Sequence, residues 1–200
     1  MEPLEGSEPR LITPLRGYVV AGGQSSRMGR DKARLPYRES TLIEHAIALA
    51  RAVTPDVRVL CGPAKRYEEF GVPVVEDPVC GVGPLGGLYG ALLRASVDGR
   101  ERVFWLAVDL PLVPSDFLNR LVCDLDRADV AMARTSRGEE PLCAAFRTEP
   151  ALAAVRRALL GGRLKLTSAL ESLLVHHAEA DADVFVNLNT FGDYDRLRHP

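Results

Sequence analysis

The sequence predicts one α/β domain with a doubly wound, mainly parallel sheet and helices on both faces. Three observations predict it. Short apolar segments alternate with amphipathic ones along the chain, a glycine-rich turn follows the first apolar segment, and acidic or polar turns follow later ones. Because no repeat or low-complexity linker interrupts this alternation, residues 16–200 are expected to form a single domain. Residues 1–15, with three prolines and no periodicity, are expected to be a flexible leader.

The first half of the chain predicts three strands and three helices. Each strand segment is short and apolar and ends near glycine, proline or an acidic residue. Ser40 and Thr41 can cap the first helix, whose apolar residues recur at helical spacing. The expected strands are residues 17–21, 57–61 and 72–75, and the expected helices are residues 42–53, residues 64–70 and a segment through Leu88 and Leu93.

The second half continues the alternation. Its most hydrophobic segment ends at Asp109, Pro114-Ser115-Asp116 predicts a helix start, and a polar turn at residues 136–138 separates two further strands. The expected strands are residues 102–108, 129–134, 141–146 and 184–187, and the expected helices are residues 115–125, 151–160 and 166–174, with a short last helix capped by Thr190.

Composition excludes several classes of protein. The net charge of -2 gives no general attraction to nucleic acid or to an anionic membrane, so neither is an expected partner. No apolar run approaches the ~20 residues that span a bilayer, and the N-terminus lacks the pattern of a signal peptide. The four cysteines are widely spaced without a C-x-x-C pair. Reduced thiols and a cytoplasmic location are therefore expected.

The turn after the first strand has the composition of a phosphate-binding loop. Gly22 and Gly23 allow close approach of backbone N–H groups, and Arg27 and Lys32 add positive charge. The glycine spacing matches neither the dinucleotide fingerprint nor the P-loop. A nicotinamide oxidoreductase is therefore excluded, while an ordinary strand-to-helix turn stays open as an alternative.

The pattern Ala21-Gly22-Gly23-x-Ser25-x-Arg27-Met28-Gly29-x-Asp31-Lys32 resembles the signature loop of nucleotidyltransferases, and most of all that of the molybdenum cofactor guanylyltransferases. The resemblance runs from Gly17 to about Leu197. It implies a Rossmann-like enzyme that transfers GMP from GTP to the phosphate of molybdenum-molybdopterin and releases pyrophosphate. It also implies molybdoenzymes or their chaperones as partners for the product.

The resemblance assigns roles to individual residues. Arg27 and Lys32 match the cations expected to stabilise the phosphates, and together with Asp109 they are the expected catalytic residues. The positions that it implies for nucleotide binding are Val20, Ala21, Gly22, Gly23, Lys32, Asp77, Gly83, Leu85 and Asp109.

Asp109 is the expected metal ligand. It follows six apolar residues, at the exit of a strand rather than inside it. Mg²⁺ takes hard oxygen ligands and commonly keeps only one or two carboxylates beside substrate phosphates. By itself the residue could equally form a solvated turn or cap, but in the resembled family the matching aspartate binds Mg²⁺.

Asp77 and the segment Gly83–Gly87 are the expected wall of the nucleotide pocket. A carboxylate at Asp77 could accept from a guanine edge or from ribose hydroxyls, and a capping role before Pro78 stays open. The glycines would let a purine lie against backbone, and the same segment can simply start a helix with proline at an early position.

Two pairs of residues are expected near the second substrate or the metal. Asn187 and Asn189 resemble the family's late Asn-x-Asn-Thr-Pro motif, with Phe191 in place of proline. Their alternative is turn chemistry. Arg163 and Lys165 could receive an anionic second substrate or form a solvated face.

Other functions of the same fold stay open. A cytidylyltransferase or a sugar-phosphate nucleotidyltransferase would use the same chemistry, although relatives of those types tend to have Ala-Ala-Gly where this chain has Ala21-Gly22-Gly23. A non-catalytic nucleotide-binding partner in cofactor delivery is a further alternative. No Gly-x-Ser-x-Gly motif is present, so covalent catalysis is not expected.

Overall fold

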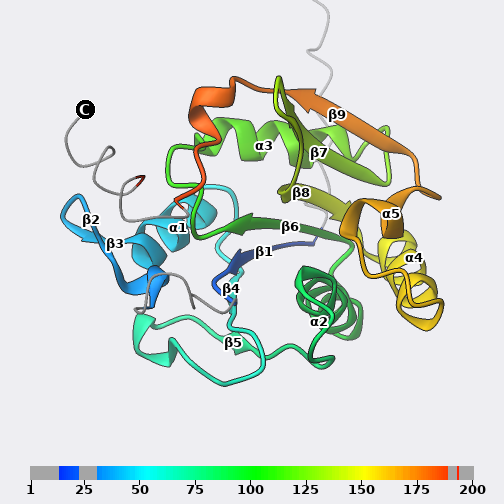
Figure 1. The fold of residues 1–200 in the computed structure, drawn as a ribbon, viewed down its shortest axis with the longest axis horizontal. Helices are drawn as coiled ribbons and strands as arrows, with labels where there is room; N and C mark the ends of the chain where they lie inside the picture. The colour runs from blue at the N-terminus through cyan, green and yellow to red at the C-terminus, as the bar shows by residue number, and fades with distance from the viewer. Residues whose placement is uncertain (1–13, 23–30, 189–192, 194–200) are drawn as a thin grey trace, which may run out of the picture.

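The computed structural model describes residues 14–22, 31–188 and 193, and a seven-stranded sheet forms its centre (Figure 1). The strands of this sheet are β1 (Leu15–Val20), β4 (Val57–Leu60), β5 (Val74–Val75), β6 (Arg102–Ala107), β7 (Val130–Thr135), β8 (Gly138–Arg147) and β9 (Val175–Glu179). They lie in the order β5-β4-β1-β6-β8-β7-β9. All run in one direction except β8, which pairs antiparallel with both neighbours. The predicted mainly parallel sheet is confirmed.

Helices cover both faces of the sheet, as the doubly wound prediction requires. The helices α1 (Leu42–Arg51) and α3 (Ser115–Asp124) pack on one face, and α2 (Pro84–Val97), α4 (Thr148–Leu160) and α5 (Leu166–Leu170) pack on the other. Alternate side chains of the central strands enter the two cores. Along β6, for example, Phe104 packs beneath α1 and α3 while Trp105 packs beneath α2 and α4, and neither has exposed surface.

The predicted late strand at residues 184–187 is wrong. A 3₁₀ turn, η3 (Ala182–Val184), ends at the first of these residues, and the last strand within the described residues is β9, which the sequence did not indicate. β9 pairs only with β7 and leaves its side chains partly exposed, so its sequence lacks the apolar signal of an inner strand. The apolar residues that predicted a strand instead fill the core from a loop, where the Phe185 ring lies 5.6 Å from that of Phe117.

The predicted helix at residues 64–70 is also wrong over most of its length. Only η2 (Glu68–Phe70) forms a 3₁₀ turn. The residue before it, Tyr67, has a left-handed backbone with φ of 74°, which an α-helix cannot accommodate. The predicted helix at residues 166–174 ends earlier, at Leu170. The helix expected after Thr190 lies outside the described residues.

Two small elements follow the loop after β1. A 3₁₀ turn, η1 (Lys32–Arg34), leads into an antiparallel pair, β2 (Pro36–Tyr37) and β3 (Ser40–Thr41). Thr41 caps the start of α1, as the sequence predicted, and Glu44 completes a capping box with it.

The four cysteines are free, as expected. Cys61 and Cys143 are buried, whereas Cys80 and Cys123 are exposed. Burial raises the pKa of both buried thiols, which keeps them protonated. None of the helices in the described ranges combines the length and apolar character needed to cross a membrane.

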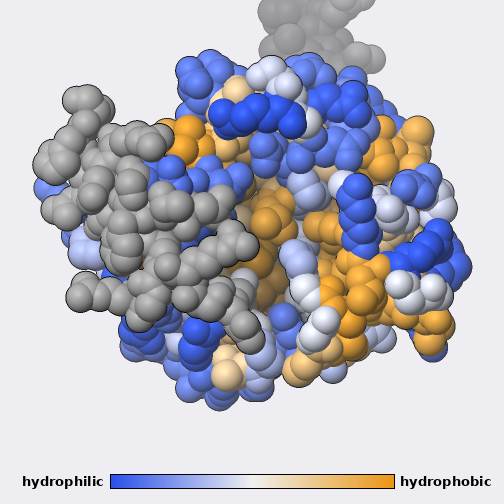
Figure 2. Space-filling view, in the orientation of Figure 1, coloured by the Kyte–Doolittle hydropathy of each residue, from blue (hydrophilic) through white to orange (hydrophobic). Residues whose placement is uncertain are grey.

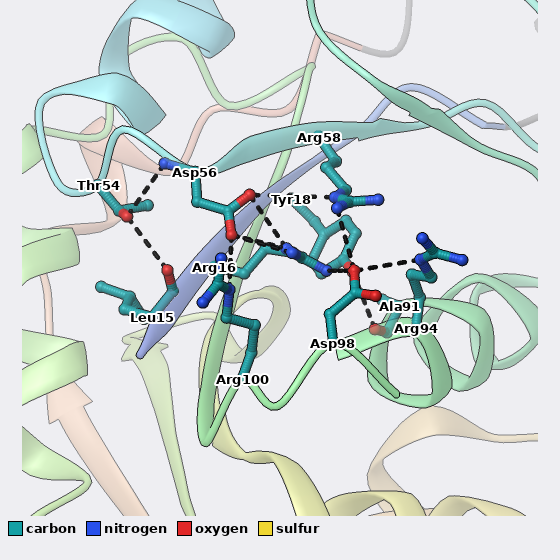
Figure 3. Close-up of polar contacts among 10 residues, drawn as sticks. All are labelled: Leu15, Arg16, Tyr18, Thr54, Asp56, Arg58, Ala91, Arg94, Asp98 and Arg100. Carbon is teal, nitrogen blue, oxygen red and sulfur yellow. Dashed lines mark hydrogen bonds and ion pairs between the residues drawn. The ribbon is translucent and has the colours of Figure 1, made fainter. Parts of the chain in front are cut away.

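A network of arginines and aspartates holds the edge at which β1 and β4 begin (Figure 3). The buried Arg16 side chain donates from Nε and Nη2 to Asp56, and from Nη1 to Asp98 at 2.7 Å. The same carboxylates accept from three further arginines: Arg58 and Arg94 donate to Asp98, and Arg100 donates to Asp56. A buried guanidinium is stable here because its two anionic partners come from neighbouring elements.

Arg16→Met should destabilise the protein strongly. The substitution removes one partner of a buried ion pair and leaves Asp56 and Asp98 with weaker, more exposed partners, so we expect a loss of about 3 kcal/mol in the free energy of unfolding. Urea unfolding at pH 7 measures it. Arg94→Met is the matched control, because the Arg94 side chain is 53% exposed; its loss should stay below ~1 kcal/mol.

Acid titration gives a second check on this network. The hydrogen bond from Arg16 lowers the pKa of Asp98 below its ordinary value of 3.8. A lowered native pKa contributes stability that is complete above the unfolded value and is lost as the pH falls through the native value. The difference in stability between wild type and Arg16→Met should therefore shrink below about pH 4. A difference that stays constant down to pH 2 would contradict this origin.

Candidate active site

Three strand exits meet at the edge where β1, β4 and β6 end. The amide of Ala21 donates to the last carbonyl of β4 at 2.9 Å, and the amide of Val108 donates to the last carbonyl of β1 at 3.0 Å. Just past β5, the amide of Asp77 donates to Gly62 O at 2.9 Å. The loops after these strands therefore share one crevice, as expected for the carboxyl ends of parallel strands.

Lys32 and Asp109 form the charged centre of this crevice. Lys32 begins η1, and Asp31 caps that turn by accepting the amide of Ala33 at 3.1 Å. Lys32 Nζ lies 2.8 Å from Asp109 Oδ2, and the two side chains are only 14% and 19% exposed. The structure thus brings together two residues that the sequence predicted to be catalytic, from the loop after β1 and from the end of β6.

Two later segments contact the surroundings of Asp109. The amide of the buried Leu188 donates to the Asp109 carbonyl at 3.2 Å, so Asn187 lies next to a residue anchored at the crevice. Glu140, from β8, is the second neighbour. Burial raises the pKa of Glu140, the charge of Arg137 opposes this shift, and the charge of Asp109 adds to it. The sequence pointed to Asn187 but gave no indication of Glu140.

A pocket of about 630 Å³ opens between the ends of β1 and β4 and the start of α2. Four residues predicted to bind nucleotide line it: Val20, Gly22, Asp77 and Gly83. Leu142 of β8 contributes an apolar wall. Figure 2 shows that this face of the molecule is hollowed near its centre, with hydrophobic atoms on the floor of the hollow, over the region where Figure 1 draws β1 and β6.

Glycines set the depth of this pocket. A Cβ at Gly86 would lie 2.4 Å from Val79 O, and a Cβ at Gly87 would lie 3.3 Å from Asp77 Oδ1. The glycines of α2 therefore let the chain after β5 lie directly against the helix. Gly83, with φ of 62°, precedes the helix, which begins with Pro84, so the segment does start a helix; its contact with a purine stays a prediction. Burial raises the pKa of Asp77, whose carboxyl lies at the pocket wall.

Some predicted residues are not brought to the crevice. Leu85 is fully buried in the core beneath α2 and does not line the pocket. Arg163 and Lys165 are exposed between α4 and α5, which Figure 1 shows at the right, whereas β1 and β6 end at the left. Three predicted site residues, Gly23, Arg27 and Asn189, lie outside the described residues.

Two residues, Arg66 at the pocket and Tyr67 beside the end of β1, were missed by the sequence analysis. Arg66 lines the pocket and donates from Nη2 to Cys61 O at 3.0 Å. Tyr67 is buried and donates its hydroxyl to Asp31 at 2.9 Å. Cys61, which lies in the same region, is fully buried with its thiol toward Val75 O. The positive charge of Arg66 was the one feature in the sequence that could have indicated a role in binding phosphates. Because residues 64–70 were predicted to form a helix, this charge was not placed at the pocket.

Comparison with known proteins agrees with this geometry. The MobA-like NTP transferase domain family matches residues 17–185. The chain belongs to this family. A molybdenum cofactor guanylyltransferase of Yersinia pestis is 33% identical over 189 residues, which cover 90% of this chain and 93% of that protein. A probable molybdenum cofactor guanylyltransferase of Opitutus terrae is 35% identical over 150 residues, 74% of each chain.

A solved structure supports the fold of this MobA-like nucleotidyltransferase. The molybdopterin-guanine dinucleotide biosynthesis protein A of Archaeoglobus fulgidus superposes with a TM-score of 0.72 at 24% identity, over 91% of this chain and 96% of that one. The crevice at the strand exits is thus the candidate active site of a nucleotidyltransferase.

Proposed function

We propose that this MobA-like nucleotidyltransferase transfers GMP from GTP to the terminal phosphate of molybdenum-molybdopterin. The product is the guanine dinucleotide form of the cofactor, and pyrophosphate leaves. The observation that carries the proposal is the Lys32–Asp109 pair, placed 2.8 Å apart at the same strand exits as the glycine-lined pocket. The names of the relatives support the choice of nucleotide and acceptor.

The pocket is proposed to hold the nucleoside. Its volume of about 630 Å³ lies within the range of small-molecule sites. Asp77 presents a carboxyl at the wall, able to accept two hydrogen bonds from a guanine edge or from ribose hydroxyls. Gly22 and Gly83 present backbone there, and Leu142 offers an apolar surface. One charged acceptor among small and apolar groups suits a flat, polar-edged base.

Lys32 is proposed to bind the triphosphate. Its ammonium group forms an ion pair with Asp109. Phosphate oxygens would compete for the same ammonium group, which would release the Asp109 carboxylate. A lysine acts on phosphates as a compact point charge. The catalytic contribution of these residues is therefore positioning and charge stabilisation rather than covalent chemistry.

Asp109 fits the role of a Mg²⁺ ligand. The described residues contain no group of three or more His, Cys, Asp and Glu side chains able to bind a metal. Mg²⁺, which keeps waters and binds phosphate oxygens, needs no such group. Asp109 would hold the ion together with the triphosphate, and Asn187, whose neighbour Leu188 donates its amide to the Asp109 carbonyl, would offer a neutral oxygen donor. When bound, the ion would supply positive charge to the departing pyrophosphate.

Pyrophosphate release tests the proposal. The protein is mixed with molybdenum-molybdopterin, Mg²⁺ and one nucleoside triphosphate at a time, and released pyrophosphate is measured. We expect turnover with GTP and at least tenfold less with CTP, UTP or ATP, because only guanine presents two adjacent donors to Asp77. Faster turnover with CTP would contradict the guanylyl assignment. Turnover only when a sugar phosphate replaces molybdopterin would contradict the acceptor.

A further inference from the structure

Tyr67 contacts both ends of the loop that joins β1 to η1. Its side chain is 1% exposed, and its hydroxyl donates to Asp31 Oδ1 at 2.9 Å. The same hydroxyl lies 3.4 Å from the carbonyl oxygen of Ala21. Ala21 belongs to the described residues before the loop and Asp31 to those after it, so one buried hydroxyl ties the two together.

The backbone of Tyr67 is held in a conformation that non-glycine residues rarely adopt. Its φ is 74°. Two guanidinium groups also lie against the ring, with Arg66 Cζ 5.0 Å and Arg34 Cζ 5.5 Å from the ring centroid. A strained backbone persists only where the surrounding contacts determine it. The hydroxyl is therefore held in one place relative to the sheet.

Asp31 links the position of the Tyr67 hydroxyl to the position of Lys32. Its Oδ1 accepts both the Tyr67 hydroxyl and the amide of Ala33, so the carboxylate that receives the tyrosine also caps η1. Lys32 is the first residue of that turn. A shift of Asp31 would therefore move the backbone from which the lysine reaches Asp109.

Arg66 connects the same segment to the pocket. It lines the pocket, donates to Cys61 O at 3.0 Å and lies 3.8 Å from Asp31 Oδ2. The Arg66-Tyr67 pair thus bridges the exit of β4, the end of β1 and the start of η1.

From these contacts we propose that Tyr67 is a positioning residue for the triphosphate: its hydroxyl fixes Asp31 against the end of β1 and thereby sets the place of Lys32. This inference rests on the proposed function, because it takes Lys32 to bind phosphates. Burial and the hydrogen bond to Asp31 raise the pKa of Tyr67 far above its ordinary range, so the hydroxyl remains a donor at physiological pH.

Removing the hydroxyl tests the inference. Tyr67→Phe keeps the ring. Tyr18→Phe is the matched control, because Tyr18 is also fully buried and its hydroxyl donates to Ala91 O over 3.0 Å. That hydrogen bond lies away from the crevice. Calorimetry with Mg²⁺ compares GTP with guanosine, which has no phosphates. We expect Tyr67→Phe to weaken GTP binding about tenfold and to leave guanosine binding unchanged. Tyr18→Phe should change neither.

Other outcomes would overturn the inference. Equal weakening of GTP and guanosine would show that Tyr67 only supports the pocket, and unchanged GTP binding would show that its hydroxyl does not position Lys32. Absence of GTP binding by the unsubstituted protein would overturn the proposed function, and the inference with it.

A double-mutant cycle identifies the route of the effect. If the hydroxyl acts through Asp31, Tyr67→Phe should add nothing to the loss of GTP affinity caused by Asp31→Ala. Additive losses would contradict this route. Should Tyr67→Phe fail to fold, Asp31→Ala alone still gives the test: it should weaken GTP while sparing guanosine, and a loss shared by both ligands would overturn the inference.

Discussion

Asp109→Asn should reduce turnover by at least three orders of magnitude while the protein stays folded. Asparagine keeps the size of the side chain and an oxygen that can accept from Lys32, but it loses the charge that we propose holds Mg²⁺ next to the triphosphate. Pyrophosphate release measured against Mg²⁺ concentration should show a large rise in the metal concentration that gives half-maximal rate.

A melting curve separates this result from unfolding. The Lys32–Asp109 pair is mostly buried but lies at the crevice rather than in the core. Asparagine retains a hydrogen bond there, so the melting temperature should move by only a few degrees, equivalent to about 1 kcal/mol. Asp116→Asn, an exposed residue in the first turn of α3, is the matched control and should retain full activity. If Asp109→Asn lowers the melting temperature strongly but the folded protein turns over at the normal rate, Asp109 caps a turn and does not bind the metal.

Lys32→Ala is the second change for which we expect a large effect. Loss of one preorganised charge contact to the phosphates should lower kcat/KM by about 10²–10³, equivalent to ~3 kcal/mol. Lys65→Ala is the control, because that side chain is 56% exposed and pairs with Glu68 instead of Asp109. Steady-state kinetics with GTP check both variants. Lys32→Arg should rescue only part of the rate, since a planar fork does not replace a compact ammonium group.

Activity of Lys32→Ala close to that of wild type would remove this lysine from the mechanism. A protein that loses activity because it unfolds would be recognised from its melting curve. If Lys32→Ala weakens the binding of GTP but not that of guanosine, the contact that it removes is one between Lys32 and the phosphates.

Much of the fold could be predicted from local patterns. The inner strands are predicted well because both of their faces are buried, so their apolar residues form continuous runs, as in Val-Phe-Trp-Leu-Ala of β6. The edge strand β9 was missed for the opposite reason: with a single partner and partly exposed side chains, its sequence Val-His-His-Ala-Glu has no apolar signal. Phe185 contributed to a false strand signal because buried loop residues are as apolar as strand residues.

The charged centre of the site could also be predicted, because its residues follow strand ends and match a motif. Lys32 and Asp109 are examples, and the structure places their side chains in contact. Tyr67 and Glu140 could not be predicted. Tyr67 acts through a contact to Asp31, which is 36 positions away in the sequence. Its left-handed backbone conformation is not indicated by the residue type either. Glu140 owes its place to the pairing of β8 with β6, which the local sequence does not encode.

The single reversed strand, β8, has a consequence for how this site can diversify. Because β8 runs against β6, with Cys143 opposite Leu106, its first residues rather than its last reach the catalytic edge. Those residues follow a tight hairpin from β7, near Thr135 and Gly138. Hairpin turns tolerate insertions, whereas crossovers between parallel strands carry whole helices. The hairpin that leads to Glu140 can therefore change length during evolution while the loops after β1, β4 and β5, which supply most of the pocket lining, stay constant.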